Sequence, residues 1–182
     1  AIDPRDLGRS YEAIIRINSQ SGKGGVAYVL SREFGLELPK PMHPEVGVLV
    51  NEKADSESRE LAANEIYQTF KAEFLEKNDP LRLLYYETQK IVGEGDDVTC
   101  SARIEIAGEA RQIEGQGNGP INAFVHSLEN DGLKDFKLTD YRQHSIGGGS
   151  ATESAAFVQL QTKAGRIAYG GGIDSSLSLI LI

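Results

Sequence analysis

The stretch GQGNGP at residues 115–120 has the composition of a site for a small anion. Glycines leave backbone N–H groups accessible, and a proline suits the first turn of a helix because its missing N–H would have no partner there. If a helix begins at Pro120, its first-turn N–H groups are available to bind a carboxylate. A simpler interpretation stays open, in which the glycines serve only a strand-to-helix turn that requires positive φ.

An apolar face follows the glycines at helical spacing. Ile121, Phe124, Val125 and Leu128 recur at i, i+3, i+4 and i+7, which is the pattern of one buried stripe on a helix. The sequence therefore predicts a strand that ends near residue 115 and a helix that starts at about Pro120.

A ligand held at this helix start would be selected by its apolar part. One methylene group in an apolar pocket changes binding by roughly 1–3 kcal/mol. Ile121, Leu138 and Leu177 have the right side chains to line such a pocket.

A second glycine cluster, at residues 170–172, repeats this arrangement. Asp174 or Ser175 could cap a helix there. The apolar face of that helix would consist of Ile173, Leu177, Ile180 and Leu181. We therefore expect the strand to end at the glycines and a second helix to follow.

Three strand-like segments precede each glycine cluster. The first set is 81–92, 98–108 and 109–115, and the second set is 136–147, 154–165 and 166–172. Runs of this length with turn residues between them are typical of antiparallel strands. The sequence predicts two β-β-β-α units in tandem.

The N-terminal part of the chain is predicted to be mostly helical. Apolar spacing favours helices over 45–54 and 64–75, whereas 19–25 and 55–60 have the composition of loops. The three prolines between residues 39 and 44 should break any helix before Glu45. We expect an α+β fold in which a helical region, residues 1–78, precedes the duplicated region, residues 79–182.

Charge and composition exclude several classes of function. The formal net charge is −8 and no basic cluster offsets it, which argues against a nucleic-acid or anionic-membrane surface. No apolar run is long enough to cross a membrane and no signal peptide is visible, so we expect a cytoplasmic protein. The single cysteine, Cys100, should be a buried thiol. The chain starts without Met and ends within an apolar segment, which suggests part of a longer polypeptide.

No catalytic arrangement can be built from the remaining residues. The SGKGG segment at 21–25 lacks the first glycine and the final Ser or Thr of a phosphate-binding loop. His43, His126 and His144 are far apart and have no neighbours at metal-ligand spacing. We therefore expect a binding domain without a metal site of its own.

Several long segments resemble the 2-isopropylmalate synthases of leucine biosynthesis. GRSYEAIIRINSQSGKGGVAYVL (8–30) and GLELPK (35–40) resemble the linker that follows the catalytic barrel of these enzymes. EGQGNGPINAFVHSL (114–128) and DYRQH (140–144) resemble their C-terminal regulatory domain, which contains two β-β-β-α units.

The resemblance implies a function in feedback regulation. The whole enzyme joins acetyl-CoA to 2-oxoisovalerate in a Claisen-type condensation that needs a divalent metal (Mg, Mn or Zn) in the catalytic barrel. The H-x-H and D-G-x-R-D motifs of that barrel do not occur here, so the fragment should be inactive alone. It should form a homodimer and bind leucine, the end product, as an allosteric inhibitor.

Residues of the leucine site are carried over from the same resemblance. They are Gly117, Gly119, Ile121, Asn122, Leu138, Tyr141, Ser145 and Leu177. Gly117 and Gly119 would offer backbone groups to the polar end of the ligand. Tyr11 matches a linker tyrosine that approaches the active site of the partner chain in this family.

The sequence also departs from the family pattern. Asn122 stands where a small apolar residue is expected, and residues 41–47 differ from the expected linker helix. Two other interpretations fit the same architecture: the isoleucine-sensing domain of the related citramalate synthases, and a purely structural dimerisation module that binds no amino acid.

Overall fold

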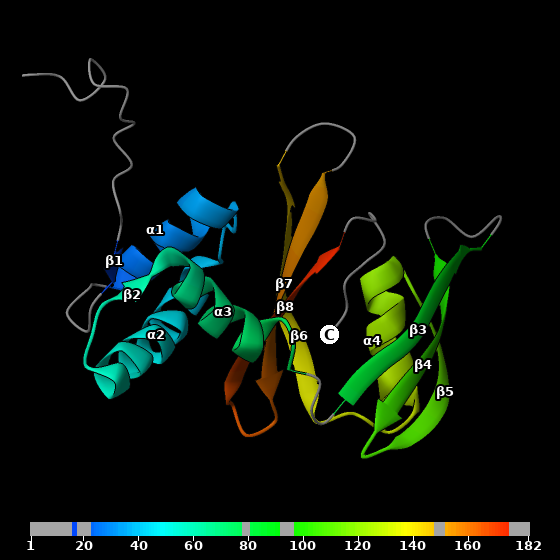
Figure 1. Ribbon diagram of the computed structural model, residues 1–182. Helices are drawn as coiled ribbons and strands as arrows, with labels where there is room; N and C mark the ends of the chain where they lie inside the picture. The colour runs from blue at the N-terminus through cyan, green and yellow to red at the C-terminus, as the bar shows by residue number, and fades with distance from the viewer. Residues whose placement is uncertain (1–15, 18–22, 78–80, 92–96, 148–151, 175–182) are drawn as a thin grey trace, which may run out of the picture. The chain divides into compact units, whose positions relative to one another are not determined.

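The structure is a computed structural model that describes residues 16–17, 23–77, 81–91, 97–147 and 152–174 (Figure 1). The chain divides into two compact units, Ala1–Phe70 and Lys71–Ile182. The division falls within a helix, and the domain limits expected from the sequence, 1–78 and 79–182, stay a prediction.

The first unit is built around two helices and the greater part of a third, which continues into the second unit. They are α1 (Lys23–Phe34), α2 (His43–Glu57) and α3 (Ala63–Phe74), with a short 3-10 turn, η2 (Lys40–Met42), before α2. Two short strands, β1 (Arg16–Ile17) and β2 (Leu61–Ala62), pair in antiparallel orientation. The helix predicted over 64–75 is confirmed by α3, whose Ile66 and Phe70 are fully buried.

Two helix ends in this unit differ from the predictions. Helix α1 begins at Lys23, so the loop predicted over 19–25 is wrong from that residue onward. Helix α2 begins at His43, before the predicted Glu45, because Pro44 lies in its first turn, where a proline needs no partner for a missing N–H. The same helix continues to Glu57, through half of the segment predicted to be a loop.

The second unit contains two three-stranded antiparallel sheets. The first sheet has the order β3 (Leu81–Lys90), β4 (Val98–Ile106), β5 (Glu109–Gly117), and the second has the order β6 (Phe136–Ile146), β7 (Glu153–Thr162), β8 (Ile167–Asp174). Helix α4 (Pro120–Asn130) connects β5 to β6 and packs on the first sheet (Figure 1). The six predicted strands and the α+β class are confirmed.

The second glycine cluster does not end its strand. Strand β8 runs through Gly170–Gly172 and ends at Asp174, so the predicted end of the strand, and a helix starting at Ile173, are wrong. Gly171 faces the ring of Phe157 on β7, where a Cβ would lie 2.7 Å from the ring carbon Cδ1. Gly171 therefore lets the Phe157 ring lie close to the backbone of β8. Residues 175–182, with the rest of the predicted second helix, lie outside the described residues.

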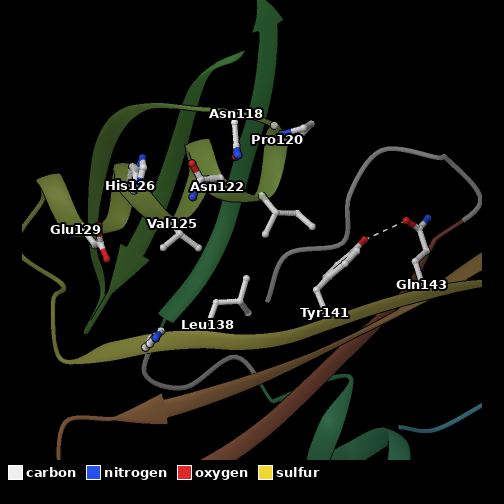
Figure 2. A pocket seen from close by; sticks show the side chains of 12 residues that line it. Asn118, Pro120, Asn122, Val125, His126, Glu129, Leu138, Tyr141 and Gln143 are labelled. Carbon is white, nitrogen blue, oxygen red and sulfur yellow. Dashed lines mark hydrogen bonds between the residues drawn. The ribbon is translucent and has the colours of Figure 1, made fainter. Parts of the chain in front are cut away.

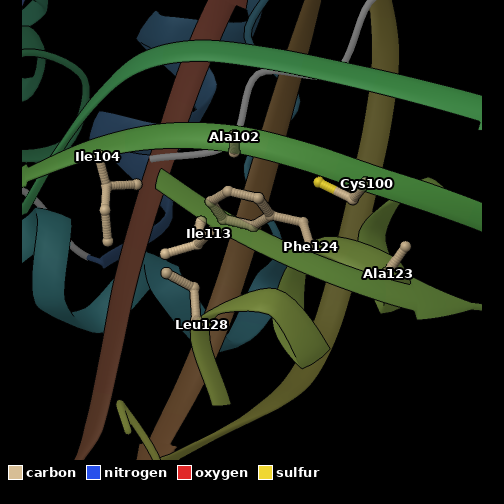
Figure 3. Close-up of a cluster of buried hydrophobic side chains, with 7 residues drawn as sticks. All are labelled: Cys100, Ala102, Ile104, Ile113, Ala123, Phe124 and Leu128. Carbon is tan, nitrogen blue, oxygen red and sulfur yellow. The ribbon is translucent and has the colours of Figure 1, made fainter. Parts of the chain in front are cut away.

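The core of the first sheet lies between β4, β5 and α4. Its buried members are Cys100, Ala102, Ile104, Ile113, Ala123, Phe124 and Leu128 (Figure 3). The ring of Phe124 is the largest of these side chains, and Tyr86 of β3 meets it edge-on at a centroid distance of 5.8 Å. Cys100 is 2% exposed, which confirms the predicted buried thiol, and burial raises its pKa.

The two sheets share one irregularity at the same position. The pairing of β3 with β4 skips Leu84, and the pairing of β6 with β7 skips Thr139. An extra unpaired residue reverses the inside–outside alternation of the strand beyond it. A bulge at the fourth residue of both β3 and β6 supports the interpretation that the two three-stranded units are repeats of each other. Apolar spacing alone is weaker support, because many unrelated strands share it.

Candidate functional site

Helix α4 starts with an open N-terminus. Its N-cap is Gly119, which has an extended backbone (φ 169°), and no side chain in the described part of the chain caps this end of the helix. The first turn closes with the bond from Ala123 N to Gly119 O at 2.9 Å. Because the helix begins at Pro120, as predicted, the N–H groups of the next residues point out of the helix end, where they favour an anion.

The glycines before α4 have two different structural purposes. A Cβ at Gly115 would lie 2.8 Å from Ser127 Cα, and a Cβ at Gly117 would lie 2.6 Å from Ala123 N. Both positions therefore need glycine so that α4 can pack closely on β5. A Cβ at Gly119 would have no atom of the described residues within 4 Å. None of the three has φ in the left-handed region that requires glycine, so the turn interpretation based on positive φ is wrong.

Two side chains of α4 bond to the outer edge of β5. His126 Nδ1 lies 2.6 Å from Gln116 O, and Asn130 Nδ2 donates to Glu114 O at 3.1 Å. Strand β5 is at the edge of its sheet, so these carbonyls have no neighbouring strand within it. These bonds hold α4 in place over the sheet. They also give hydrogen-bond partners to two backbone carbonyls on the exposed edge of β5.

A cavity of about 520 Å³ opens beside the first turn of α4 (Figure 2). One wall consists of residues 118–122 with Val125, His126 and Glu129 from the helix. The facing wall comes from β6 and consists of Lys137, Leu138, Tyr141 and Gln143. Pockets that hold small ligands have volumes of about 300–1,000 Å³, so the size suits a small metabolite.

The bulge at Thr139 determines which residues of β6 face the cavity. In a regular strand Leu138 and Tyr141 would point to opposite faces. With Thr139 unpaired, Leu138 lies opposite Leu160 and Tyr141 lies opposite Val158, which places both side chains on one face. The Tyr141 hydroxyl donates to Gln143 Oε1 at 3.0 Å, and burial raises the pKa of Tyr141. The cavity thus has an apolar floor and a polar end.

The lining residues support binding better than catalysis. The described residues contain no group of three or more His, Cys, Asp or Glu side chains placed to hold a metal ion. The cavity offers backbone N–H groups, amides and the Tyr141 hydroxyl next to aliphatic side chains, and His126, Glu129 and Lys137 also line it. No helix within the described ranges is long and apolar enough to cross a membrane.

Comparison with known families assigns the chain. A sequence model of the LeuA allosteric (dimerisation) domain matches residues 60–178, which include both sheets and α4. This chain belongs to the LeuA allosteric domain family. Residues 1–31 match a second description, alpha-isopropylmalate synthase, post-catalytic domain-like.

Relatives of the LeuA domain agree with this assignment. The chain is 41% identical to the 2-isopropylmalate synthase of Clostridium acetobutylicum, over 97% of this chain and 32% of the relative. It is 37% identical to that of Rhodospirillum rubrum (96% and 31%) and 36% identical to that of Corynebacterium glutamicum (97% and 28%). The chain thus spans about a third of the length of the curated relatives it matches. The resemblance to 2-isopropylmalate synthases is confirmed.

The LeuA domain brings five of the expected leucine-site residues to one cavity. They are Gly119, Ile121, Asn122, Leu138 and Tyr141. Gly117 does not line it, because it lies beneath the first turn of α4. Ser145 is exposed on β6 and also stays outside the lining. Leu177 and Tyr11 lie outside the described residues. The leucine site itself stays a prediction.

Several lining residues were not anticipated from the sequence. They are Asn118, Val125, His126, Glu129, Lys137 and Gln143. Asn122, Val125 and Glu129 follow each other at three- and four-residue steps, so helical spacing could have placed them on one stripe. Val125 was assigned to the buried face of the helix, whereas it is half-buried at the border of that face.

Proposed function

We propose that this chain is the regulatory part of a 2-isopropylmalate synthase and binds leucine in the cavity beside α4. The observation that carries the proposal is the meeting of two features in one cavity. The uncapped N-terminus of α4 opens on one side, and the aliphatic side chains of Ile121, Val125 and Leu138 form the floor. A free branched-chain amino acid has both matching parts.

The carboxylate of leucine would bind the N–H groups of the first turn of α4. A negative charge at a helix N-terminus gains about 0.3–1 kcal/mol, and up to about 2 kcal/mol where the site is partly buried. Asn118, Asn122 and Tyr141 would supply further polar contacts to the ammonium and carboxylate groups. The isobutyl group would lie against Val125 and Leu138.

The regulatory function requires more than this chain. The family description includes dimerisation, and we propose a homodimer. Allosteric inhibition needs a second site and two states with different ligand contacts. We propose that the second site is the active site of the longer enzyme, which condenses acetyl-CoA with 2-oxoisovalerate in the cytoplasm with the help of a divalent metal. The metal belongs to that catalytic domain, and this chain should have no turnover by itself.

Isothermal titration calorimetry with leucine, isoleucine and valine tests the proposal. The wild-type chain should bind leucine most tightly, with saturable heat. Gly119→Val should lose binding because its side chain would enter the space at the helix start, where no described residue lies within 4 Å of the Cβ position. Stronger binding of isoleucine would favour the citramalate synthase alternative. Absence of heat with all three amino acids would leave only a dimerisation function.

A further inference from the structure

The cavity beside α4 adjoins a second cavity of about 370 Å³. Two residues line both of them, Val125 of α4 and Leu138 of β6. The second cavity is predominantly apolar, and Phe124, Leu128 and Leu160 belong to its lining. A ligand in the first cavity therefore has an apolar space behind the two shared residues.

Val125 and Leu138 approach this boundary from opposite walls. Figure 2 shows the Val125 side chain extending from α4 toward Leu138, which extends from β6 toward the helix. The Val125 side chain ends at its two γ-methyl groups and is shorter than that of Leu138. Both residues are half-buried. The position of Leu138 is fixed by the bulge at Thr139 and by its pairing with Leu160. Val125 thus stands at the boundary between the two cavities, on the wall opposite Leu138.

We infer that Val125 is a specificity-determining residue that limits the length of the ligand's aliphatic group. This inference rests on the proposed function, because it requires an amino acid in the cavity beside α4. A ligand whose side chain ends at Val125 makes full contact with it. A longer side chain would collide with Val125 unless the residue at this position were smaller.

The expected effects follow from the energetics of apolar pockets. One methylene group gained or lost in such a pocket changes binding about 10- to 200-fold. Val125→Ala removes two methyl groups and connects the cavities. It should weaken leucine binding by about 10-fold or more and improve methionine and phenylalanine relative to leucine by a similar factor. Val125→Leu adds volume and should favour valine over leucine.

Calorimetric titration of the full 182-residue chain with valine, leucine, methionine and phenylalanine tests this inference. Val48→Ala is the matched control, because Val48 is 54% exposed on α2 and lines neither cavity. It should leave the order of affinities unchanged. Circular dichroism and thermal melting of each variant establish that it is folded. The two Val125 substitutions change volume in opposite directions, so misfolding of one leaves the other as a test.

The outcomes separate this inference from the proposed function. A reversal of preference toward longer ligands in Val125→Ala, and toward shorter ones in Val125→Leu, supports the inference. If the wild-type chain binds leucine but both variants keep its order of affinities, the role of Val125 is overturned and the proposed function stands. If the wild-type chain binds none of the four, both are overturned.

Discussion

Gly117 lies so close beneath α4 that a Cβ at this position would come within 2.6 Å of the backbone nitrogen of Ala123. Gly115 has the same relationship one turn further along the helix, to Ser127. Of the two glycines expected in the leucine site, Gly117 is therefore first of all a packing residue. Gly119 has no atom of the described residues within 4 Å of its Cβ position, so it can act on the ligand without supporting the helix.

Alanine substitutions should distinguish these glycines. Gly115→Ala should lower the free energy of unfolding by about 1–3 kcal/mol, because the added methyl group overlaps backbone atoms of α4 that cannot move independently. Gly119→Ala should leave stability within about 0.5 kcal/mol of the wild type, since nothing opposes the new methyl group. Urea unfolding followed by circular dichroism measures both. Equal stability of the two variants would contradict the packing explanation.

Ser58 should be replaceable by glycine with a gain in stability. It ends α2 in the left-handed conformation (φ 51°, ψ 37°), and Arg59 N returns to Ala54 O at 3.2 Å. A residue with a Cβ pays roughly 1–2 kcal/mol for this conformation, which glycine avoids. Thermal unfolding should show Ser58→Gly to be more stable by up to about 1 kcal/mol. The matched control, Ser56→Gly inside α2, should be less stable than the wild type. A destabilised Ser58→Gly would be inconsistent with the observed helix end.

Glu65 should contribute to acid sensitivity. Hydrogen bonds from Arg59, at 2.9 and 2.6 Å, and from Ala62 N–H lower the pKa of its carboxyl from 4.5 to about 2. A carboxyl whose pKa is depressed by folding contributes stability above the unfolded pKa, and this contribution is lost as the pH falls through the folded value. The stability difference between the wild type and Glu65→Gln should therefore shrink between pH 4.5 and 2.

Urea unfolding of both proteins across this pH range provides the measurement. Glu57→Gln is a useful comparison, because Glu57 also pairs with Arg59 but has no bond to a backbone N–H in the described residues. Its effect should be smaller, as expected of an exposed ion pair. A stability difference for Glu65→Gln that stays constant from pH 5 to 2 would refute the role of this carboxyl.

Cys100 should be chemically inert in the folded chain. The thiol is buried in the core beneath α4, and burial raises its pKa, so both access and thiolate formation are suppressed. Labelling with iodoacetamide at pH 8 should proceed only as fast as the chain unfolds. Addition of urea should release rapid labelling, which serves as the positive control. Rapid modification under native conditions would mean that α4 is not closely packed on the sheet.

Apolar spacing predicted the helices and strands well wherever apolar side chains recur at regular intervals. The stripe from Ile121 to Leu128 places α4 correctly, and the strand-like run over 136–147 predicts β6. The pattern failed at residues 170–172. Glycines have no side chain to show periodicity. Gly171 is needed because the ring of Phe157, on the neighbouring strand β7, packs against its backbone.

The candidate site was predicted only in outline for a related reason. The start of α4 could be inferred from Pro120 and the glycines before it. The bulge at Thr139, which brings Tyr141 to the same face as Leu138, leaves no mark in residue types, because it is defined by pairing with β7. Val125 was missed as a lining residue because it lies at the border between the buried and open faces of α4.

The central claim, that leucine binds at the start of α4, is tested most directly by NMR. Leucine would be titrated into the ¹⁵N-labelled chain while the backbone amide resonances are followed. Saturable shifts centred on the amides of Gly119, Ile121 and Asn122, and absent from α1 and α2, are the predicted result. Shifts that are absent, or that cluster away from α4 and β6, would contradict the claim.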